Sequence, residues 1–189
     1  MKIILGSQSR FRAQALMEAG IVVDECISPG IDEKAIRNDN PEELVLALAK
    51  AKAAAIIDKI DGPAILITAD QVVMCNGEIR ERPVDRAEAI RFLASYVAWP
   101  AVVVNGLQVT NTATGKVATG IDRSEIIYKP TLLAKIEEIV DNSFALEAAG
   151  ALVEENPMMI PHELRRTGEI DSFMGMPIEL VKRLMREVE

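Results

Sequence analysis

The stretch Ala64-Ile-Leu-Ile-Thr-Ala-Asp-Gln-Val-Val-Met-Cys75 decides the fold, because it is a long apolar run that ends at Asn76-Gly77. Such a run predicts a buried strand, and the Asn-Gly pair predicts a hairpin turn directly after it. Apolar runs elsewhere in the chain predict further strands at 2–6, 21–27, 102–110 and 116–128.

Segments with helical periodicity alternate with these strands, which predicts an α/β fold. The expected helices are 9–19, 40–59, 85–96, 131–141 and 177–188. The clearest start is Asn40-Pro-Glu-Glu43, with a capping residue, a proline at the first position and a glutamate that completes a capping box. Residues 152–169 follow no pattern and are expected to be irregular. No linker or repeat interrupts the chain, so we expect residues 1–189 to form a single domain.

The composition limits the classes of function. The chain has 189 residues, 21 Lys and Arg against 29 Asp and Glu, and a net charge of −8. Such an acidic chain does not favour a nucleic-acid polymer or an anionic membrane as partner, whereas a small anion can still bind to a local cluster of cations. No apolar run reaches the length of about 18 residues that a membrane helix needs.

The chemical inventory is equally restrictive. A single histidine, His162, excludes a multi-histidine metal site, and no Walker A or GxGxxG loop is present. We assign no role to His162, whose neighbourhood is expected to be a surface loop. The cysteines, Cys26 and Cys75, form no CxxC pair, which indicates a reduced, cytoplasmic protein. Both are expected to be small core residues.

The first candidate cluster is Ser7-Gln-Ser-Arg-Phe-Arg12, between the first strand and the first helix. At such a junction, backbone N–H groups and the positive helix end point to one place that favours an anion. The two hydroxyls and an arginine add donors for phosphate oxygens. The alternative is that Ser9 is only a helix cap and that the arginines are solvated.

The second candidate is Lys52. On a helical wheel, the apolar residues of 44–56 cover an arc of about 140°, and Lys52 lies near its middle. A lysine at the centre of a buried face is unfavourable unless an anion is present to pair with it. The alternative is a long side chain whose ammonium reaches solvent past the edge of the helix.

The remaining candidates are carboxylates and a further arginine. Asp70 lies within the apolar strand, where a carboxylate is either paired or functional, as a metal ligand or as a base. Glu33 in the loop Ile31-Asp-Glu33 is a plausible second oxygen ligand, although acidic residues in loops are usually solvated. Arg82 follows the hairpin and carries little information alone. Together the candidates suit metal-assisted attack of water on a phosphoanhydride.

Five motifs, in order along the chain, resemble those of the Maf family of nucleoside triphosphate pyrophosphatases. The resemblance extends over essentially the whole length, although Arg82 stands where the family has lysine and Arg10 where it has proline. The motifs are Gly6-Ser-Gln-Ser-Arg-Phe-Arg12, Ile31-Asp-Glu33, residues 41–53, Thr68-Ala-Asp-Gln-Val72 and Met174-Gly-Met-Pro177.

This resemblance implies a cytoplasmic hydrolase that converts a nucleoside triphosphate to the monophosphate and pyrophosphate with Mg²⁺ or Mn²⁺. The implied fold is a single elongated α/β domain, with a mixed central sheet flanked by helices and a cleft between two lobes, similar to inosine triphosphatase. Asp70 would accept a proton and bind the metal with Glu33, and Lys52 would act beside them. The phosphates would be bound by Ser7, Ser9, Arg12 and Arg82.

Three positions of the family look like substrate selectors, and here they are Arg12, Gln71 and Glu155. Together with the aromatic Phe11, they are similar to the branch that hydrolyses 7-methyl-GTP. Glu155 could accept hydrogen bonds from a guanine edge, and Phe11 could stack on a purine. The alternatives are a dTTP/UTP-type member and a nucleotide-binding regulator of septum formation with little turnover. The expected partner is the nucleotide, with a homodimer left open and neither a nucleic-acid polymer nor a membrane involved.

Overall fold

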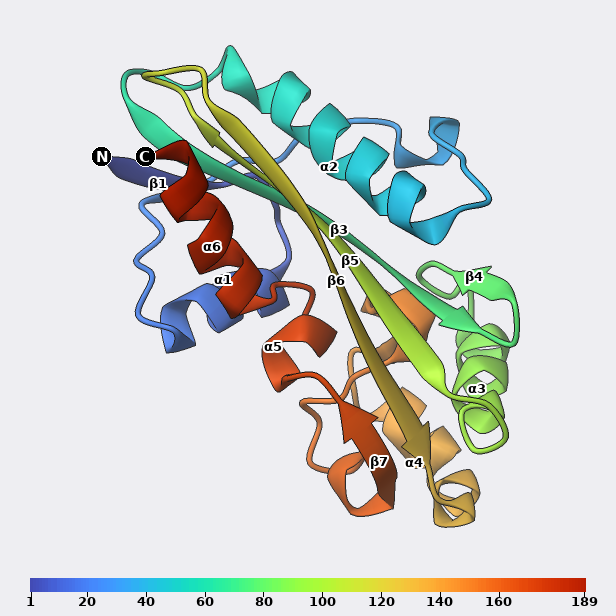
Figure 1. The fold of residues 1–189 in the computed structure, drawn as a ribbon. Coiled ribbons are helices and arrows are strands. Elements are labelled where there is room, and N and C mark those ends of the chain that lie inside the picture. Colours follow the sequence, from blue (N-terminus) through green and yellow to red (C-terminus); the bar gives the residue numbers. More distant parts are fainter. The chain divides into compact units, whose positions relative to one another are not determined.

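The computed structural model describes residues 1–189, which divide into two compact units (Figure 1). The first unit consists of Met1–Asp70, Asn105–Asp122 and Gly175–Glu189. The second consists of Gln71–Val104 and Arg123–Met174. Each unit is therefore assembled from segments that are distant in the sequence.

A mixed seven-stranded sheet provides the framework, with the strand order β2-β1-β3-β5-β6-β7 and with β4 paired to β3. β1 pairs in parallel with both β2 and β3, whereas the β3–β4 and β6–β7 pairs are antiparallel. The fold class is thus α/β with a mixed sheet flanked by helices, as predicted. The strands are β1 (Lys2–Leu5), β2 (Glu25–Cys26), β3 (Ala64–Cys75), β4 (Glu78–Arg80), β5 (Ala101–Asn111), β6 (Val117–Tyr128) and β7 (Glu163–Thr167).

The helices follow the predicted order. They are α1 (Arg10–Glu18), α2 (Pro41–Ile57), α3 (Arg86–Ser95), α4 (Ile136–Asp141), α5 (Ile170–Phe173) and α6 (Ile178–Val188). Short 3-10 helices are η1 (Glu33–Ala35), η2 (Pro130–Ala134), η3 (Ala145–Glu147), η4 (Ala149–Ala151) and η5 (Ile160–His162). The expected helix at 131–141 is thus divided into η2 and α4, with Lys135 between them.

The apolar stretch Ala64–Cys75 forms a strand followed by a hairpin turn, as its sequence predicts. β3 spans Ala64–Cys75 and pairs with β4 through the Asn76-Gly77 turn, in which both residues have positive φ. The Asn40 side chain accepts hydrogen bonds from the backbone N–H groups of Glu42 and Glu43 and so caps α2. The carboxylate of Glu43 accepts from the side chain of Asn38 instead of closing the capping box.

Three expectations about the fold are wrong. The strand expected at 21–27 is only Glu25–Cys26, and Cys26 is exposed, because this short segment lies at the edge of the sheet. Residues 152–169 are not wholly irregular, since β7 pairs with β6 there. His162, to which we assign no role, ends η5 directly before β7, and its ring bonds to the Thr131 hydroxyl. Cys75 is buried, as expected.

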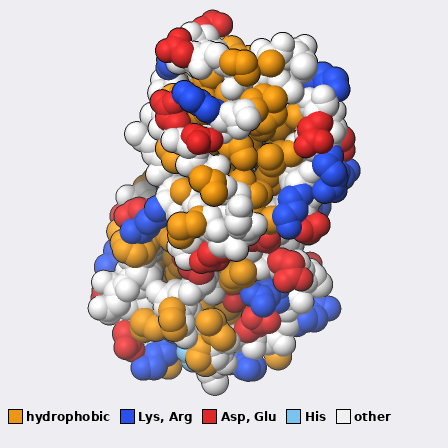
Figure 2. Space-filling model, turned by 90° about the vertical axis from the view of Figure 1, so that its left-hand side faces the viewer, with side chains coloured by type: hydrophobic (Ala, Val, Ile, Leu, Met, Phe, Trp, Pro, Cys, Tyr) orange, Lys and Arg blue, Asp and Glu red, His pale blue; other side chains and the backbone are white.

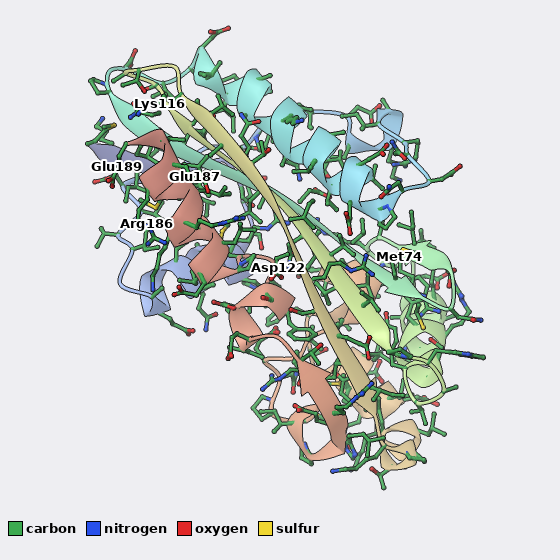
Figure 3. The ribbon with its side chains drawn as sticks, viewed as in Figure 1. Met74, Lys116, Asp122, Arg186, Glu187 and Glu189 are labelled. Carbon is green, nitrogen blue, oxygen red and sulfur yellow. The ribbon has the colours of Figure 1, made fainter.

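In the first unit, α2 lies on one side of the sheet and α1 and α6 lie on the other (Figure 1). α2 approaches β5 closely at Gly106, where an added Cβ would lie 2.6 Å from the carbonyl carbon of Val45. Asn105 next to it donates to the carboxylate of Asp122 at 3.2 Å. Asp122 lies on β6 and is labelled in Figure 3. The close approach at Gly106 fixes the depth at which α2 presents its inward side chains.

The second unit has its own apolar core, in which α3 and α4 pack together. Both tyrosines of the chain, Tyr96 and Tyr128, are fully buried in it. The guanidinium of Arg80 is also buried there, stacked 4.7 Å from the centre of the Phe92 ring. An arginine in this position keeps its charge because Glu78 and the Ser95 hydroxyl accept hydrogen bonds from it.

None of the helices combines the length and the apolar composition needed to cross a membrane. On the face shown in Figure 2, acidic and basic side chains are interspersed, and apolar side chains gather between them. Although the chain has a net charge of −8, its acidic side chains do not form a single patch on this face.

We expect Gly106→Ala to lower the free energy of unfolding by about 1–3 kcal/mol, because the new methyl group meets the backbone of α2, which cannot move aside locally. Urea unfolding would measure the change. The matched control is Gly120→Ala, whose methyl group meets only the flexible ends of the Leu180 and Arg183 side chains and should cost less. Equal losses for the two variants would contradict this account of the α2–β5 contact.

Candidate active site

A buried lysine lies between two carboxylates in the first unit. The ammonium of Lys52 is 2.5 Å from Oδ1 of Asp70 and 2.9 Å from Oε1 of Glu33. Lys52 and Asp70 are both buried, while the Glu33 side chain is about half exposed. The structure thus brings together the three residues predicted to act in catalysis.

The local sequence explains why these groups meet. Lys52 projects from the apolar face of α2, between Leu48 and Ile56, as the helical wheel predicts. Asp70 lies on β3, which α2 covers, and Glu33 begins the short helix η1. A lone charge at this depth would be strongly unfavourable, and removing one partner from such a buried pair typically costs about 3–5 kcal/mol.

The Ser7–Arg12 loop lies against the same strand. Oγ of Ser7 accepts hydrogen bonds from the backbone N–H of Ser9 and from the guanidinium of Arg12. Arg12 also donates to the carbonyl oxygen of Ala69 at 2.8 Å, and the Lys52 ammonium is 3.5 Å from that oxygen. Two cationic groups therefore converge directly beside Asp70.

The role expected for Ser9 needs correction in one respect. Ser9 occupies the N-cap position of α1, but its side chain makes no capping hydrogen bond. The N-terminal end of α1 is instead connected to the loop through the Ser7 hydroxyl. The positive end of a helix and two hydroxyls thus lie beside Arg12, an arrangement that suits an anion.

The carboxylates fit a hard divalent cation. Mg²⁺ and Mn²⁺ are commonly held by one or two carboxylates, with phosphate and water oxygens completing the coordination. Asp70 and Glu33 already converge on one positive group, the Lys52 ammonium. No cluster of three or more His, Cys, Asp or Glu side chains that could hold a metal ion occurs in the chain. Substrate and water would therefore have to supply most of the ligands.

The other predicted site residues belong to the second unit. The side-chain amide of Gln71 donates to the carbonyl oxygens of Ser172 and Phe173, at 3.2 and 3.1 Å. Arg82 is exposed just after β4, and Glu155 is half-buried between η4 and η5. Gln71 is thus anchored to the backbone at the end of α5, with both of its bonds made inside the unit.

Sequence reasoning missed a buried carboxylate next to Glu155. The side chain of Glu154 is almost completely buried, and the Tyr128 hydroxyl donates a hydrogen bond to its Oε2. Its Oε1 has no hydrogen-bond partner and lies 3.9 Å from a guanidinium nitrogen of Arg166. Burial raises the pKa of Glu154 to about 7, against the lowering effect of the Tyr128 hydrogen bond. Only the apolar run before it, Ala151-Leu-Val153, hinted at this burial.

Comparisons with known proteins agree with the resemblance. The sequence profile of the family described as Maf-like protein matches residues 2–188. A 7-methyl-GTP pyrophosphatase of Dictyostelium discoideum is 35% identical over 98% of this chain and 96% of its own length. One from Vibrio vulnificus is 30% identical, over 98% and 95%. A dTTP/UTP pyrophosphatase of Geotalea uraniireducens is 31% identical, over 97% and 94%.

The pKa of Glu154 predicts a specific pH dependence of stability. Because the folded protein holds this proton up to about pH 7 and the unfolded chain releases it near 4.5, Glu154 weakens folding as the pH rises through that window. We therefore expect Glu154→Gln to gain on the order of 3 kcal/mol relative to the wild type between about pH 4 and about pH 8.

Urea unfolding at several pH values would measure this difference. The control is Glu169→Gln, which removes an exposed carboxylate of the same unit and should leave the wild-type profile unchanged. Parallel profiles for the wild type and Glu154→Gln would contradict the raised pKa.

Proposed function

This chain belongs to the Maf-like family and is a nucleoside triphosphate pyrophosphatase, and we propose that it hydrolyses 7-methyl-GTP with the help of a divalent cation. The observation that carries the proposal is the convergence of Asp70, Glu33 and Lys52 beside the Ser7–Arg12 loop. The products would be the nucleoside monophosphate and pyrophosphate. We further propose that residues 1–189 act as one functional domain.

The charge of the cluster supports a metal requirement. Lys52 with Asp70 and Glu33 carries a formal charge of +1 − 2 = −1, which disfavours the approach of a triphosphate. A divalent cation held by the two carboxylates would make this charge positive. When bound, such a cation supplies electrostatic stabilisation of the charge that develops on the phosphate oxygens.

The residues of the chain then have distinct roles. A carboxylate oxygen of Asp70 would accept the proton of the attacking water, since this carboxylate is held in place by the Lys52 ammonium. Lys52 and Arg12 would bind phosphate oxygens, because both already reach toward the carbonyl oxygen of Ala69. Ser7 and Ser9 would add hydrogen-bond donors, and Arg82 is proposed as a further donor to phosphate oxygens.

The preference for 7-methyl-GTP is supported by the residues at the three selector positions and by the similar relatives of that name. Glu155 would accept hydrogen bonds from the guanine edge, a role for which a carboxylate is suited. Phe11 would stack on the purine, and this contact strengthens when methylation makes the ring cationic. The 31% identity to a dTTP/UTP pyrophosphatase makes a pyrimidine substrate the second candidate.

We expect Asp70→Asn to lower kcat for pyrophosphate release by about 10²–10⁴-fold, because the amide cannot accept the proton. The assay is pyrophosphate release from 7-methyl-GTP, dTTP, UTP, CTP, GTP and ITP, with and without Mg²⁺. Asp58→Asn, at an exposed position of the same unit, is the control and should behave as the wild type. Turnover by Asp70→Asn near the wild-type rate would rule out Asp70 as the base.

Glu155→Gln tests the substrate assignment. We expect the ratio of kcat/KM for 7-methyl-GTP over UTP to fall about tenfold or more, because the carboxamide replaces one acceptor oxygen with a donor that opposes the guanine N–H groups. Steady-state kinetics with both nucleotides would measure the ratio, with Glu169→Gln as the control for loss of a carboxylate. An unchanged preference in Glu155→Gln would contradict the assignment.

A further inference from the structure

The segment 150–155 of the second unit is held at both ends by tyrosine hydroxyls. Tyr96 donates to the carbonyl oxygen of Gly150 at 2.7 Å, and Tyr128 donates to the carboxylate of Glu154. These are the only two tyrosines of the chain, and both side chains are fully buried. Both phenols therefore serve the segment that carries Glu155.

The same segment is tied to the loop that carries Arg82. The N–H of Gly150 donates to the carbonyl oxygen of Glu81 at 2.9 Å, directly before Arg82 in the chain. Gly150 has φ +61°, and an added Cβ would lie 2.5 Å from the Tyr96 hydroxyl and 2.8 Å from Cβ of Val73. Only glycine fits this position, so the backbone can approach both partners.

The two tyrosines are also joined to each other. The backbone N–H of Tyr128 donates to the carbonyl oxygen of Tyr96 at 3.1 Å. The buried guanidinium of Arg80 lies 5.1 Å from the centre of the Tyr96 ring and bonds to Glu78 on the same strand. The ends of α3, β4 and β6 thus form one connected support beneath the segment.

Burial keeps both phenols protonated. It raises the pKa of Tyr96 and of Tyr128 above the ordinary value, and the neighbouring Glu154 carboxylate raises that of Tyr128 further. Each hydroxyl therefore remains a hydrogen-bond donor over the working range of pH.

We propose that Tyr96 and Tyr128 are positioning residues for base selection, which hold segment 150–155 so that Glu155 keeps a fixed relation to Arg82. This inference rests on the proposed function, in which Glu155 contacts the base and Arg82 the phosphates. The bond between Gly150 and Glu81 joins the segment that carries Glu155 to the one that carries Arg82. A base of the wrong shape then cannot be accommodated by a shift of Glu155 alone.

The central test is the removal of each hydroxyl in Tyr96→Phe and Tyr128→Phe, which keeps the buried ring. We expect the ratio of kcat/KM for 7-methyl-GTP over UTP to fall about three- to tenfold in each variant, the size expected for one lost hydrogen bond. The loss should arise in KM for 7-methyl-GTP, with kcat little changed, because the groups proposed for chemistry belong to the first unit.

The matched control is Thr110→Val, which removes a buried hydroxyl of the first unit that accepts from the Gln108 amide. In Thr110→Val the ratio of kcat/KM for 7-methyl-GTP over UTP should stay at the wild-type value, even though the free energy of unfolding falls. A second pair separates positioning from general destabilisation: Glu154→Gln keeps an acceptor for Tyr128 and should keep the ratio, whereas Glu154→Leu removes the acceptor and should lower it.

Amide hydrogen exchange supplies a readout that does not depend on activity. Exchange over residues 149–156 should become faster in Tyr96→Phe and stay unchanged in Thr110→Val, because only the former loses a bond to Gly150. A wild-type ratio in active Tyr96→Phe and Tyr128→Phe would overturn the positioning role. If the wild type itself released no pyrophosphate, the proposed function would be refuted instead. Unchanged amide hydrogen exchange over residues 149–156 in Tyr96→Phe would independently overturn the claim that Tyr96 anchors this segment.

Discussion

The burial of the Lys52 ammonium between two carboxylates is the constraint on which the first unit depends. A charge inside the α2–β3 interface is tolerable only with a partner at hydrogen-bond distance, and Asp70 is that partner. The pairing requires α2 to lie close to the sheet, which the bare backbone at Gly106 permits. The geometry of the fold and the composition of the candidate site are therefore two consequences of the same contact.

The sequence could predict this part of the site because regular elements position it. The helical wheel of α2 was enough to place Lys52 in the middle of its apolar face. Asp70 stood out because it is a carboxylate within the apolar sequence of β3. Glu33 has no periodic pattern around it, so the sequence marked it only as a plausible second oxygen ligand beside Asp70, and its contact with Lys52 became visible only in three dimensions. The bond from Arg12 to the Ala69 carbonyl joins residues distant in the chain, and no local pattern encodes it.

The second unit was harder to predict for the same physical reason. β7 (Glu163–Thr167) is an edge strand in which no residue is buried, so its sequence is charged and lacks an apolar pattern. The buried Glu154 carboxylate accepts a hydrogen bond from a phenol of β6, a partner that its own neighbourhood in the sequence does not reveal. Arg80 is charged and ends the short strand β4, yet it pairs opposite Val73 and is buried in the core. These contacts join residues that are distant in the sequence, so they could not be predicted before the sheet was assembled.

The proposed catalytic residues lie on regular elements, whereas the proposed base-contacting residue Glu155 lies on a turn, and this contrast suggests how substrate preference could change. Asp70 and Lys52 are held by a strand and a helix, so their substitution disturbs the core of the first unit. Glu155 follows a turn that is fixed by a few hydrogen bonds from side chains, at Gly150 and Glu154. Exchanging such an anchor alters the path of one segment while the carboxylates and the lysine keep their places. If Glu155 contacts the base as proposed, a change in the side chains that anchor this turn would alter substrate preference without moving the proposed catalytic residues.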